Sequence, residues 1–396
     1  MSVINQAIEI KSKLPDVGTT IFSIMNQFAV EHNAINLGQG FPEFNPDEKL
    51  LNLVNEAMRA GHNQYAPMPG IPAFRNEIAN KVKNLYNADV NADTEVTVTS
   101  GATEALMVAI QAVVHPGDEV IIIEPCYDSY VPCIRLAGGI PVFVQLNKPT
   151  SANPSYSMNW QQLKDAINKK TKLIILNFPH NPTGITLQQD DLNTLSEITR
   201  NKNIFLIADE VYEHIVFRKQ TFLSFLTHPE LRSKTFGISS FGKTYHNTGW
   251  KIGYCIAPQN LTAEFRKIHQ FTVFSVPTPF QYGLAEFMKD PSHYLKLSDF
   301  YEKKHDLLLN GLKETKFKAI PSEGTFFLLA DYSEISDQLE ADFAIKLTKE
   351  VGVGSIPVSA FYQDPKSEKA NNQIIRFCFA KSNQTLDKAI QLLKKI

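Results

Sequence analysis

The feature that most constrains the fold is an alternation of short β-branched runs with helical patterns between about residue 46 and residue 285. Seven apolar runs have the length of strands: 95–99, 119–124, 140–145, 173–177, 204–209, 235–240 and 253–257. Such alternation is typical of a mostly parallel sheet with helices on both faces. The last two runs are joined too briefly to hold a crossover helix, so the seventh strand is predicted to be antiparallel to its neighbours. We therefore predict an α/β fold with a seven-stranded sheet.

The helical patterns divide the chain further. The best of them begins at Ala102 and has apolar residues at 102, 105, 106, 109, 110 and 113, which predicts one face buried against the sheet. Beyond about residue 285 the pattern changes to a Lys/Leu-rich helix and the segments SEGTFFLLADYS and NQIIRFCFAKS, typical of a smaller α+β domain. We predict an N-terminal arm (1–45) that joins the small domain, a large domain (46–285) and a small C-terminal domain (286–396).

Composition limits the partners. Lys and Arg number 39 against 41 Asp and Glu, a formal charge of -2, which argues against a nucleic-acid or anionic-membrane surface. A transcription factor built on this fold would also need an added DNA-binding domain, for which the first 45 or so residues offer no room.

The cysteines and the apolar runs predict the compartment. The four cysteines form no C-x-x-C pair and fall in apolar surroundings, so we interpret them as reduced core thiols, with neither a disulfide frame nor a metal site. The N-terminus has no apolar core of signal-peptide length, and no apolar run approaches the ~18 residues of a membrane span. We predict a cytoplasmic protein.

The segment 235–257, TFGISSFGKTYHNTGWKIGYCIA, places Lys243 on irregular backbone just past a predicted strand end. Open α/β sheets bind their ligands at that edge. Ser240 and Lys251 offer a hydroxyl and a second cation for a phosphate, which leaves Lys243 to form a Schiff base with a carbonyl compound. Taken alone, Lys243 has a simpler alternative as a solvated loop lysine.

Other candidates also follow predicted strand ends. Gly101, Ala102 and Thr103 begin the amphipathic helix, whose unpaired N–H groups suit a phosphate; the alternative is an ordinary Ser-capped helix. Tyr127, after the second strand, can stack on a planar heterocycle or simply pack. Asp209 ends the fifth strand, where it would pair with a protonated pyridine nitrogen or cap the next helix.

Three more candidates lie in loops and in the small domain. Asn181, in NFPHNPTG after the fourth strand, can donate its amide hydrogen to a phenolate oxygen. Arg376 shares a strand face with Cys378 and Ala380, where a guanidinium has room to bind a carboxylate; a surface arginine is the alternative. Gly40, in LGQGFPEFNP, either lets a ligand approach the backbone or only shapes a turn.

The pattern S-x-x-K followed by T-G-W-[RK]-x-G-Y, together with NFPHNPTG, resembles the class I aminotransferases, fold type I enzymes that use pyridoxal 5′-phosphate. The resemblance extends from LGQGFPEF to IRFCFAKS. It implies that Lys243 binds the cofactor covalently, that Asp209 contacts the ring nitrogen, and that Arg376 holds the α-carboxylate of the amino acid. Asn181 and Tyr212 would share the ring hydroxyl.

A narrower resemblance concerns the substrate. Lys251 stands where many members have Arg, and SFGKTYHNTGWKIGY with KIHQFTVFSVPTP is most similar to the branch of methionine, glutamine and kynurenine aminotransferases. The resemblance implies a homodimer in which Tyr65 reaches the other copy's cofactor phosphate, and a pocket lined by Phe22 and Phe274, the latter from the other copy. We expect methionine and phenylalanine as donors, with glutamine and kynurenine as further candidates. A cysteine-conjugate C–S β-lyase and an aspartate-type aminotransferase are the alternatives.

Overall fold

The seven predicted runs form one sheet. In the computed structural model, which describes residues 10–396, its strand order is β2-β8-β7-β6-β5-β3-β4. Strand β8 is antiparallel to both β2 and β7, while the other pairs are parallel, which confirms both predictions. The strands are β2 (Val96–Thr99), β3 (Glu119–Glu124), β4 (Ile140–Gln145), β5 (Thr171–Asn177), β6 (Phe205–Asp209), β7 (Thr235–Ser240) and β8 (Gly253–Ile256).

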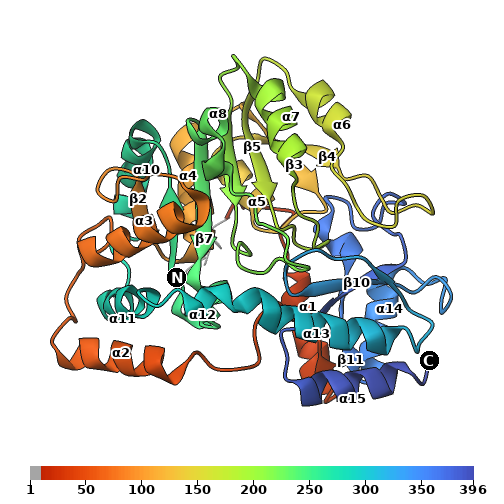
Figure 1. Cartoon of the computed structure of the whole chain (residues 1–396). Helices are drawn as coiled ribbons and strands as arrows, with labels where there is room; N and C mark the ends of the chain where they lie inside the picture. Colours follow the sequence, from red (N-terminus) through yellow and green to blue (C-terminus); the bar gives the residue numbers. More distant parts are fainter. Residues whose placement is uncertain (1–9) are drawn as a thin grey trace, which may run out of the picture.

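Helices cover both faces of this sheet (Figure 1), which explains why its strands are continuously apolar. Val120 and Ile122 pack with α4 (Gly101–Val113), α5 (Tyr130–Leu136) and α10 (Gln259–Thr272). Ile121 and Ile123, which point the other way, pack with α6 (Trp160–Ala166), α7 (Gln189–Thr199) and α8 (Pro229–Arg232). The helices α2 (Glu48–Arg59), α3 (Pro72–Tyr86) and α11 (Thr278–Met288) pack beside the β2 edge.

The C-terminal part holds a second, antiparallel sheet of order β12-β13-β10-β9. Its core includes side chains of α13, α14 and α15. The elements are α12 (Ser292–Leu295), α13 (Leu297–Leu312), β9 (Lys318–Ile320), β10 (Phe327–Asp331), α14 (Glu340–Lys346), β11 (Val353–Gly354), β12 (Ile356–Pro357), β13 (Ile374–Cys378) and α15 (Asn383–Leu393).

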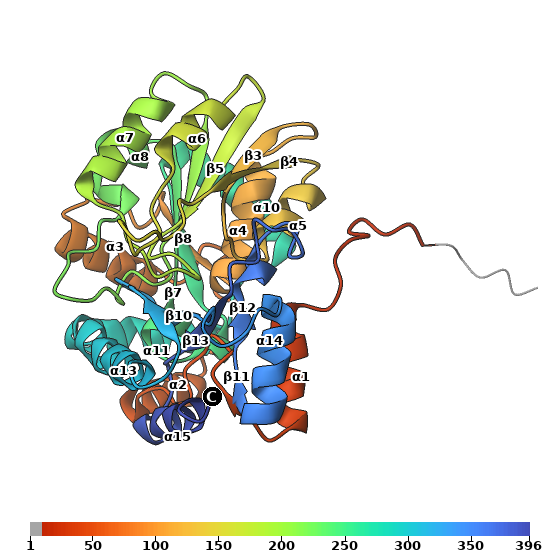
Figure 2. The same ribbon diagram turned by 90° about the vertical axis from the view of Figure 1, so that its right-hand side faces the viewer.

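The N-terminal segment contains a helix that the sequence analysis did not predict. Helix α1 (Ile21–Glu31) begins after Thr20, whose side chain accepts the Ser23 N–H at 3.3 Å. It packs against residues of α14 and β12, and Figure 2 shows it beside α14, far from α6 and α7. Strand β1 (Ile35–Asn36) pairs with β11. The first nine residues of the predicted arm lie outside the described residues, and the domain boundaries at 45 and 285 stay a prediction.

The four cysteines are buried, as predicted for core thiols. Within residues 10–396 we find no cluster of three His, Cys, Asp or Glu side chains that could hold a metal ion. No helix in this range has the length and hydropathy to cross a membrane.

Candidate active site

A cavity of about 330 Å³ lies at the carboxyl ends of the parallel strands, between the two sheets. Strand ends β5, β6 and β7, the start of α4, strand β13 and the loop at residues 39–41 all contribute to its walls. The cavity brings together most of the predicted site residues: Phe22, Gly40, Gly101, Ala102, Thr103, Tyr127, Asn181, Asp209, Tyr212, Ser240, Lys243, Lys251 and Arg376.

Lys243 lies on a single helical turn, α9 (Phe241–Thr244), and the prediction of irregular backbone is wrong. The turn follows β7 directly because the Ser240 side chain caps it, accepting the Gly242 N–H at 3.2 Å. Lys243 Nζ donates to the Gly40 carbonyl at 2.9 Å and lies 5.6 Å from the centroid of the Tyr212 ring. Burial lowers the pKa of Lys243 to about 8, so about a tenth of its amine is neutral and nucleophilic at pH 7.

Asp209 is buried at the end of β6, where the Tyr130 hydroxyl donates to its Oδ2 at 2.6 Å. Burial raises the pKa of this carboxyl to about 6. Asn177 fixes the neighbouring backbone, since its amide donates to the Asp209 carbonyl and its Oδ1 accepts the Asn181 N–H. The carboxylate therefore has a defined position and lacks a close cationic partner within the described part of the chain, which suits a cationic ring nitrogen.

The start of α4 forms a cradle for an anion. Gly101 has φ +72°, and a Cβ there would lie 3.3 Å from Cε of Lys251. Lys251 Nζ donates to Thr103 Oγ1 at 3.2 Å. Ser100 makes no side-chain cap, so the alternative of an ordinary Ser-capped helix is wrong. A helix N-terminus, a hydroxyl and a lysine together suit a phosphate group.

Arg376 is fully buried, with 1% of its surface exposed, so the alternative of a surface arginine is wrong. Its Nη1 donates to Asn181 Oδ1 at 2.6 Å, its Nη2 donates to the Gly38 carbonyl at 3.2 Å, and its Nε has no partner. Both acceptors are neutral, so the buried charge is available to an anionic ligand. Burial lowers the pKa of Arg376 to about 10.

The strand pattern predicted small residues around Arg376, but aromatic rings surround it instead. The rings of Phe327, Phe361 and Phe22 lie 3.8, 4.9 and 5.4 Å from its guanidinium carbon. They come from three separate segments, so the alternation within β13 could not indicate them. The result is a cation held among aromatic rings, a setting in which its attraction for a carboxylate is less screened than in water.

Tyr65 and Phe274 lie outside the cavity. They are 84% and 43% exposed, and their rings pack edge to face with centroids 5.5 Å apart. The roles implied for them require a second copy of the chain, and those roles stay predictions.

Several residues of the site were not predicted from the sequence. Tyr130 follows Tyr127 by three residues in EPCYDSY, a spacing that places two side chains on one side of a helical turn and could have indicated it. Gln39, Phe41, Thr248 and Phe327 also line the cavity; the first three lie in the motifs LGQGFPEFNP and TGWKIGY, which could have indicated them.

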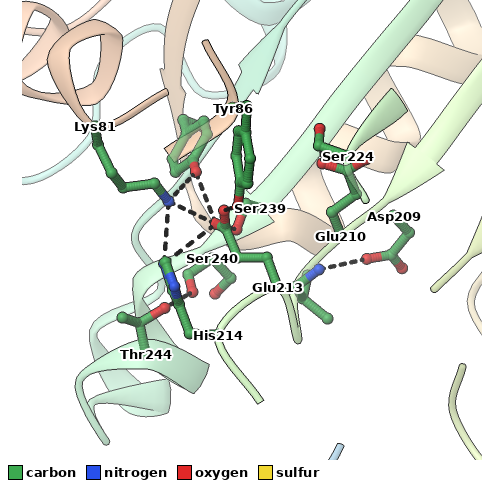
Figure 3. Close-up of polar contacts among 12 residues, drawn as sticks. Lys81, Tyr86, Asp209, Glu210, Glu213, His214, Ser224, Ser239, Ser240 and Thr244 are labelled. Carbon is green, nitrogen blue, oxygen red and sulfur yellow. Dashed lines mark hydrogen bonds and ion pairs between the residues drawn. The ribbon is translucent and has the colours of Figure 1, made fainter. Parts of the chain in front are cut away.

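A buried polar network around Glu213 lies next to the cavity (Figure 3). Glu213 Oε1 accepts hydrogen bonds from Lys81 Nζ at 2.6 Å, from Ser239 Oγ at 2.6 Å and from Tyr254 at 2.9 Å. The Tyr86 hydroxyl donates to the other oxygen. Burial favours the neutral acid, but Lys81 outweighs it and holds the pKa of Glu213 well below its usual range.

This network adjoins two cavity residues in the chain. Glu213 follows Tyr212, and Ser239 precedes Ser240, so fixing one residue of each pair restrains the other.

A second buried carboxylate lies nearby. Glu210 accepts hydrogen bonds from Ser224 Oγ and the Phe225 N–H, both at 2.8 Å. Burial raises the pKa of Glu210 to about 8.

Comparison with known proteins gives consistent matches. The model of the family "Aminotransferase class I and II" matches residues 32–393. The methionine aminotransferase of Escherichia coli K12 is 47% identical over 387 residues, covering 98% of either chain. The kynurenine–oxoglutarate transaminase of Dictyostelium discoideum is 35% identical, covering 96% of this chain and 94% of its own. A crystal structure of an Escherichia coli protein identified as having a methionine aminotransferase function superposes with a TM-score of 0.94 and 46% identity, covering 98% of this chain and 100% of the other.

Proposed function

The chain belongs to the class I and II aminotransferase family, and on this premise we propose that it uses pyridoxal 5′-phosphate to transfer the amino group of an apolar or aromatic amino acid to a 2-oxo acid. The motifs predicted this family, and the likeness confirms the enzyme class and the fold type I architecture. The observation that carries the proposal is the meeting of Lys243, Asp209 and Arg376 in one cavity.

The residues present fit the cofactor. A buried carboxylate at Asp209 matches a protonated pyridine nitrogen, and Tyr212 and Asn181 line the same cavity and would contact the ring hydroxyl. The start of α4, Ser240 and Lys251 match the phosphate. Lysine at 251 supplies charge without the fork of an arginine, so it binds the phosphate as a point charge.

The cofactor, when bound, supplies an electron sink for the pair of electrons that remains when the α-proton leaves. Lys243 Nζ would hold the cofactor, and its amine, when free and neutral, would remove the α-proton of the amino acid. The negative charge of the Asp209 carboxylate would favour the protonated form of the ring nitrogen. Arg376 orients the amino acid through its α-carboxylate, which places the α-carbon near Lys243.

The lining supports apolar and aromatic donors. Phe22, Phe41 and Phe327 give the cavity an aromatic wall, against which a thioether or a ring packs well. The cations that line the cavity within the described residues are Lys243, Lys251 and Arg376, each already assigned. A second carboxylate, as in aspartate, would be desolvated there without a partner.

A C–S β-lyase would share every cofactor contact, so the products must discriminate. A β-lyase releases pyruvate and ammonia from a cysteine conjugate, whereas transamination yields the 2-oxo acid of the donor. The names of the relatives favour transamination.

The proposal includes a homodimer with shared sites. Tyr65 and Phe274 lie outside their own cavity and are exposed side by side, as residues that act in a second copy should be. In that arrangement Tyr65 reaches the partner's phosphate and Phe274 lines the partner's substrate pocket. The cytoplasmic location stays a prediction from the sequence.

Borohydride reduction tests the cofactor assignment. The purified protein should be yellow, and borohydride should bleach it and fix the cofactor on Lys243, as read from the mass of the digested peptide. Lys251→Met is the control, since it weakens phosphate binding and leaves the attachment point in place. Recovery of the reduced cofactor on any other lysine would overturn the assignment.

A further inference from the structure

A buried Glu104–His269 pair lies outside the cavity and joins two parts of the proposed site. His269, on α10, is fully buried, and its Nδ1 lies 2.7 Å from Glu104 Oε1. Its Nε2 lies 3.1 Å from the Met68 carbonyl. On the other side, Glu104 Oε2 accepts the N–H of Ser100 at 2.8 Å. His269 belongs to the sequence motif KIHQFTVFSVPTP, and its hydrogen bonds give this motif a structural role outside the cavity.

The chemistry of the pair requires both imidazole nitrogens. A carbonyl oxygen only accepts hydrogen bonds, so Nε2 carries its hydrogen and donates to Met68. Nδ1 and Glu104 Oε1 then share one proton, and the contact is a strong hydrogen bond whichever atom holds it. Loss of either link leaves a buried polar group without a partner.

One end of the pair fixes the anion cradle. The Ser100 N–H donates to Glu104 Oε2 at the point where the chain turns into α4, while the Ser100 hydroxyl does not cap the helix. The next residue, Gly101, has φ +72° and lies against Lys251. The position of Glu104 therefore sets the turn that presents Gly101 and Thr103 to the cavity.

The other end fixes the segment that carries Tyr65. Alternate carbonyls of this segment accept hydrogen bonds from side chains of residues 269–278: Gln64 from Thr278 at 2.6 Å, Ala66 from Ser275 at 3.1 Å and Met68 from His269 at 3.1 Å. These bonds hold the backbone on both sides of Tyr65, while its ring stays 84% exposed. A rigid backbone with an exposed aromatic ring is a suitable contact for a second copy.

We infer that Glu104 and His269 are a positioning pair that couples the anion cradle of one copy to the segment that this copy offers to its partner. Cofactor binding should therefore tighten the dimer, and dimer formation should tighten cofactor binding by the same factor. This inference rests on the proposed function, because it needs a phosphate in the cradle and a dimer that uses Tyr65.

Two substitutions of similar size separate the two links. In His269→Gln the amide nitrogen reaches the place of Nε2, so the bond to Met68 is kept and the bond to Glu104 is lost. In His269→Asn the amide reaches the place of Nδ1, so the bond to Glu104 is kept and the bond to Met68 is lost. A purely structural role would make the two variants alike.

The readouts are the cofactor dissociation constant, from absorbance titration of the apoprotein, and the dimer dissociation constant, from sedimentation with and without pyridoxal phosphate. His269→Gln should weaken cofactor binding at least about tenfold and leave the apo dimer unchanged. His269→Asn should weaken the apo dimer at least about tenfold and leave cofactor binding by the assembled dimer unchanged. Both variants should reduce the tightening of the dimer by the cofactor, and the part that remains comes from the direct contact between Tyr65 and the partner's phosphate.

Glu340→Gln is the matched control, since Glu340 is another buried carboxylate and accepts backbone N–H groups of Ser359, Asn372 and Ile374. It should lower stability and keep the coupling. Equal losses of thermal stability in both His269 variants with unchanged coupling would overturn the inference. A wild-type protein that binds no cofactor or forms no dimer would instead refute the proposed function. If neither His269 variant folds, Ser275→Ala, which removes the bond to Ala66, should weaken the apo dimer, and an unchanged dimer would overturn the inference.

Discussion

Substitution of Arg376 by lysine keeps the positive charge of the cavity and removes the planar fork. The guanidinium has two bonded nitrogens, Nη1 to Asn181 and Nη2 to the Gly38 carbonyl, and an unbonded Nε. A carboxylate can accept two parallel N–H bonds from such a group, whereas an ammonium offers one bond in that geometry. The substitution therefore costs one hydrogen bond between charged groups, about 1.5 to 3 kcal/mol.

That loss corresponds to a fall in kcat/KM of about 10- to 150-fold. The assay is kcat/KM for methionine with one 2-oxo acid at saturation, combined with the visible absorbance of the bound cofactor, which should stay unchanged. Arg218→Lys is the control, because Arg218 is an exposed arginine that pairs with Glu302 and Asp306 away from the cavity. A change in kcat/KM of less than about twofold for Arg376→Lys would refute the assignment of the α-carboxylate.

Three further predictions concern buried carboxylates. Asp209→Asn should bind the cofactor but slow single-turnover deamination of methionine at least about tenfold, because an opposing charge moves a pKa by about 1 to 3 units and the ring nitrogen loses that support; an unchanged rate would reject the role of Asp209. Glu210 has a folded pKa of about 8 against an ordinary value of 4.5, so the folded state binds more protons between these values and the free energy of unfolding falls as pH rises through this window. Glu210→Gln should therefore gain stability relative to the wild type from pH 5 to pH 8 in urea melts, and a constant difference would show that Glu210 does not titrate there. Lys81→Met leaves the Glu213 carboxylate buried without its cation and should lower the free energy of unfolding by about 3 to 5 kcal/mol, with partial recovery on adding Glu213→Gln. A loss below about 1 kcal/mol would show that the three hydroxyl donors suffice for Glu213.

The large sheet was predictable because its strands are covered on both faces and therefore read as continuous apolar runs. The site was predictable for a related reason, since parallel strands end at one edge and residues such as Asp209 and Lys243 meet there regardless of their separation in sequence. Helix α1 was not predicted although Ile21, Met25 and Ala29 have helical spacing, because the segment around it has little strand pattern and was interpreted as an arm.

Other features depend on contacts between distant segments. The aromatic rings around Arg376 come from α1, β10 and the segment after β12, and no pattern within β13 indicates them. Lys81 and Glu213 are far apart in the chain, and each alone resembles an ordinary surface charge. Only the folded arrangement shows that both are buried and paired.

The donor preference tests the central claim most directly. The measurement is kcat/KM for methionine, phenylalanine, glutamine and aspartate with one common 2-oxo acid at saturation. We predict that methionine and phenylalanine exceed aspartate by at least about tenfold, because within residues 10–396 no unassigned cation lines the cavity for a second carboxylate and an unpaired buried charge costs more than about 1.4 kcal/mol. If aspartate leads the series, a cation that we have not recognised must line the pocket, and the account of an aminotransferase for apolar donors is wrong.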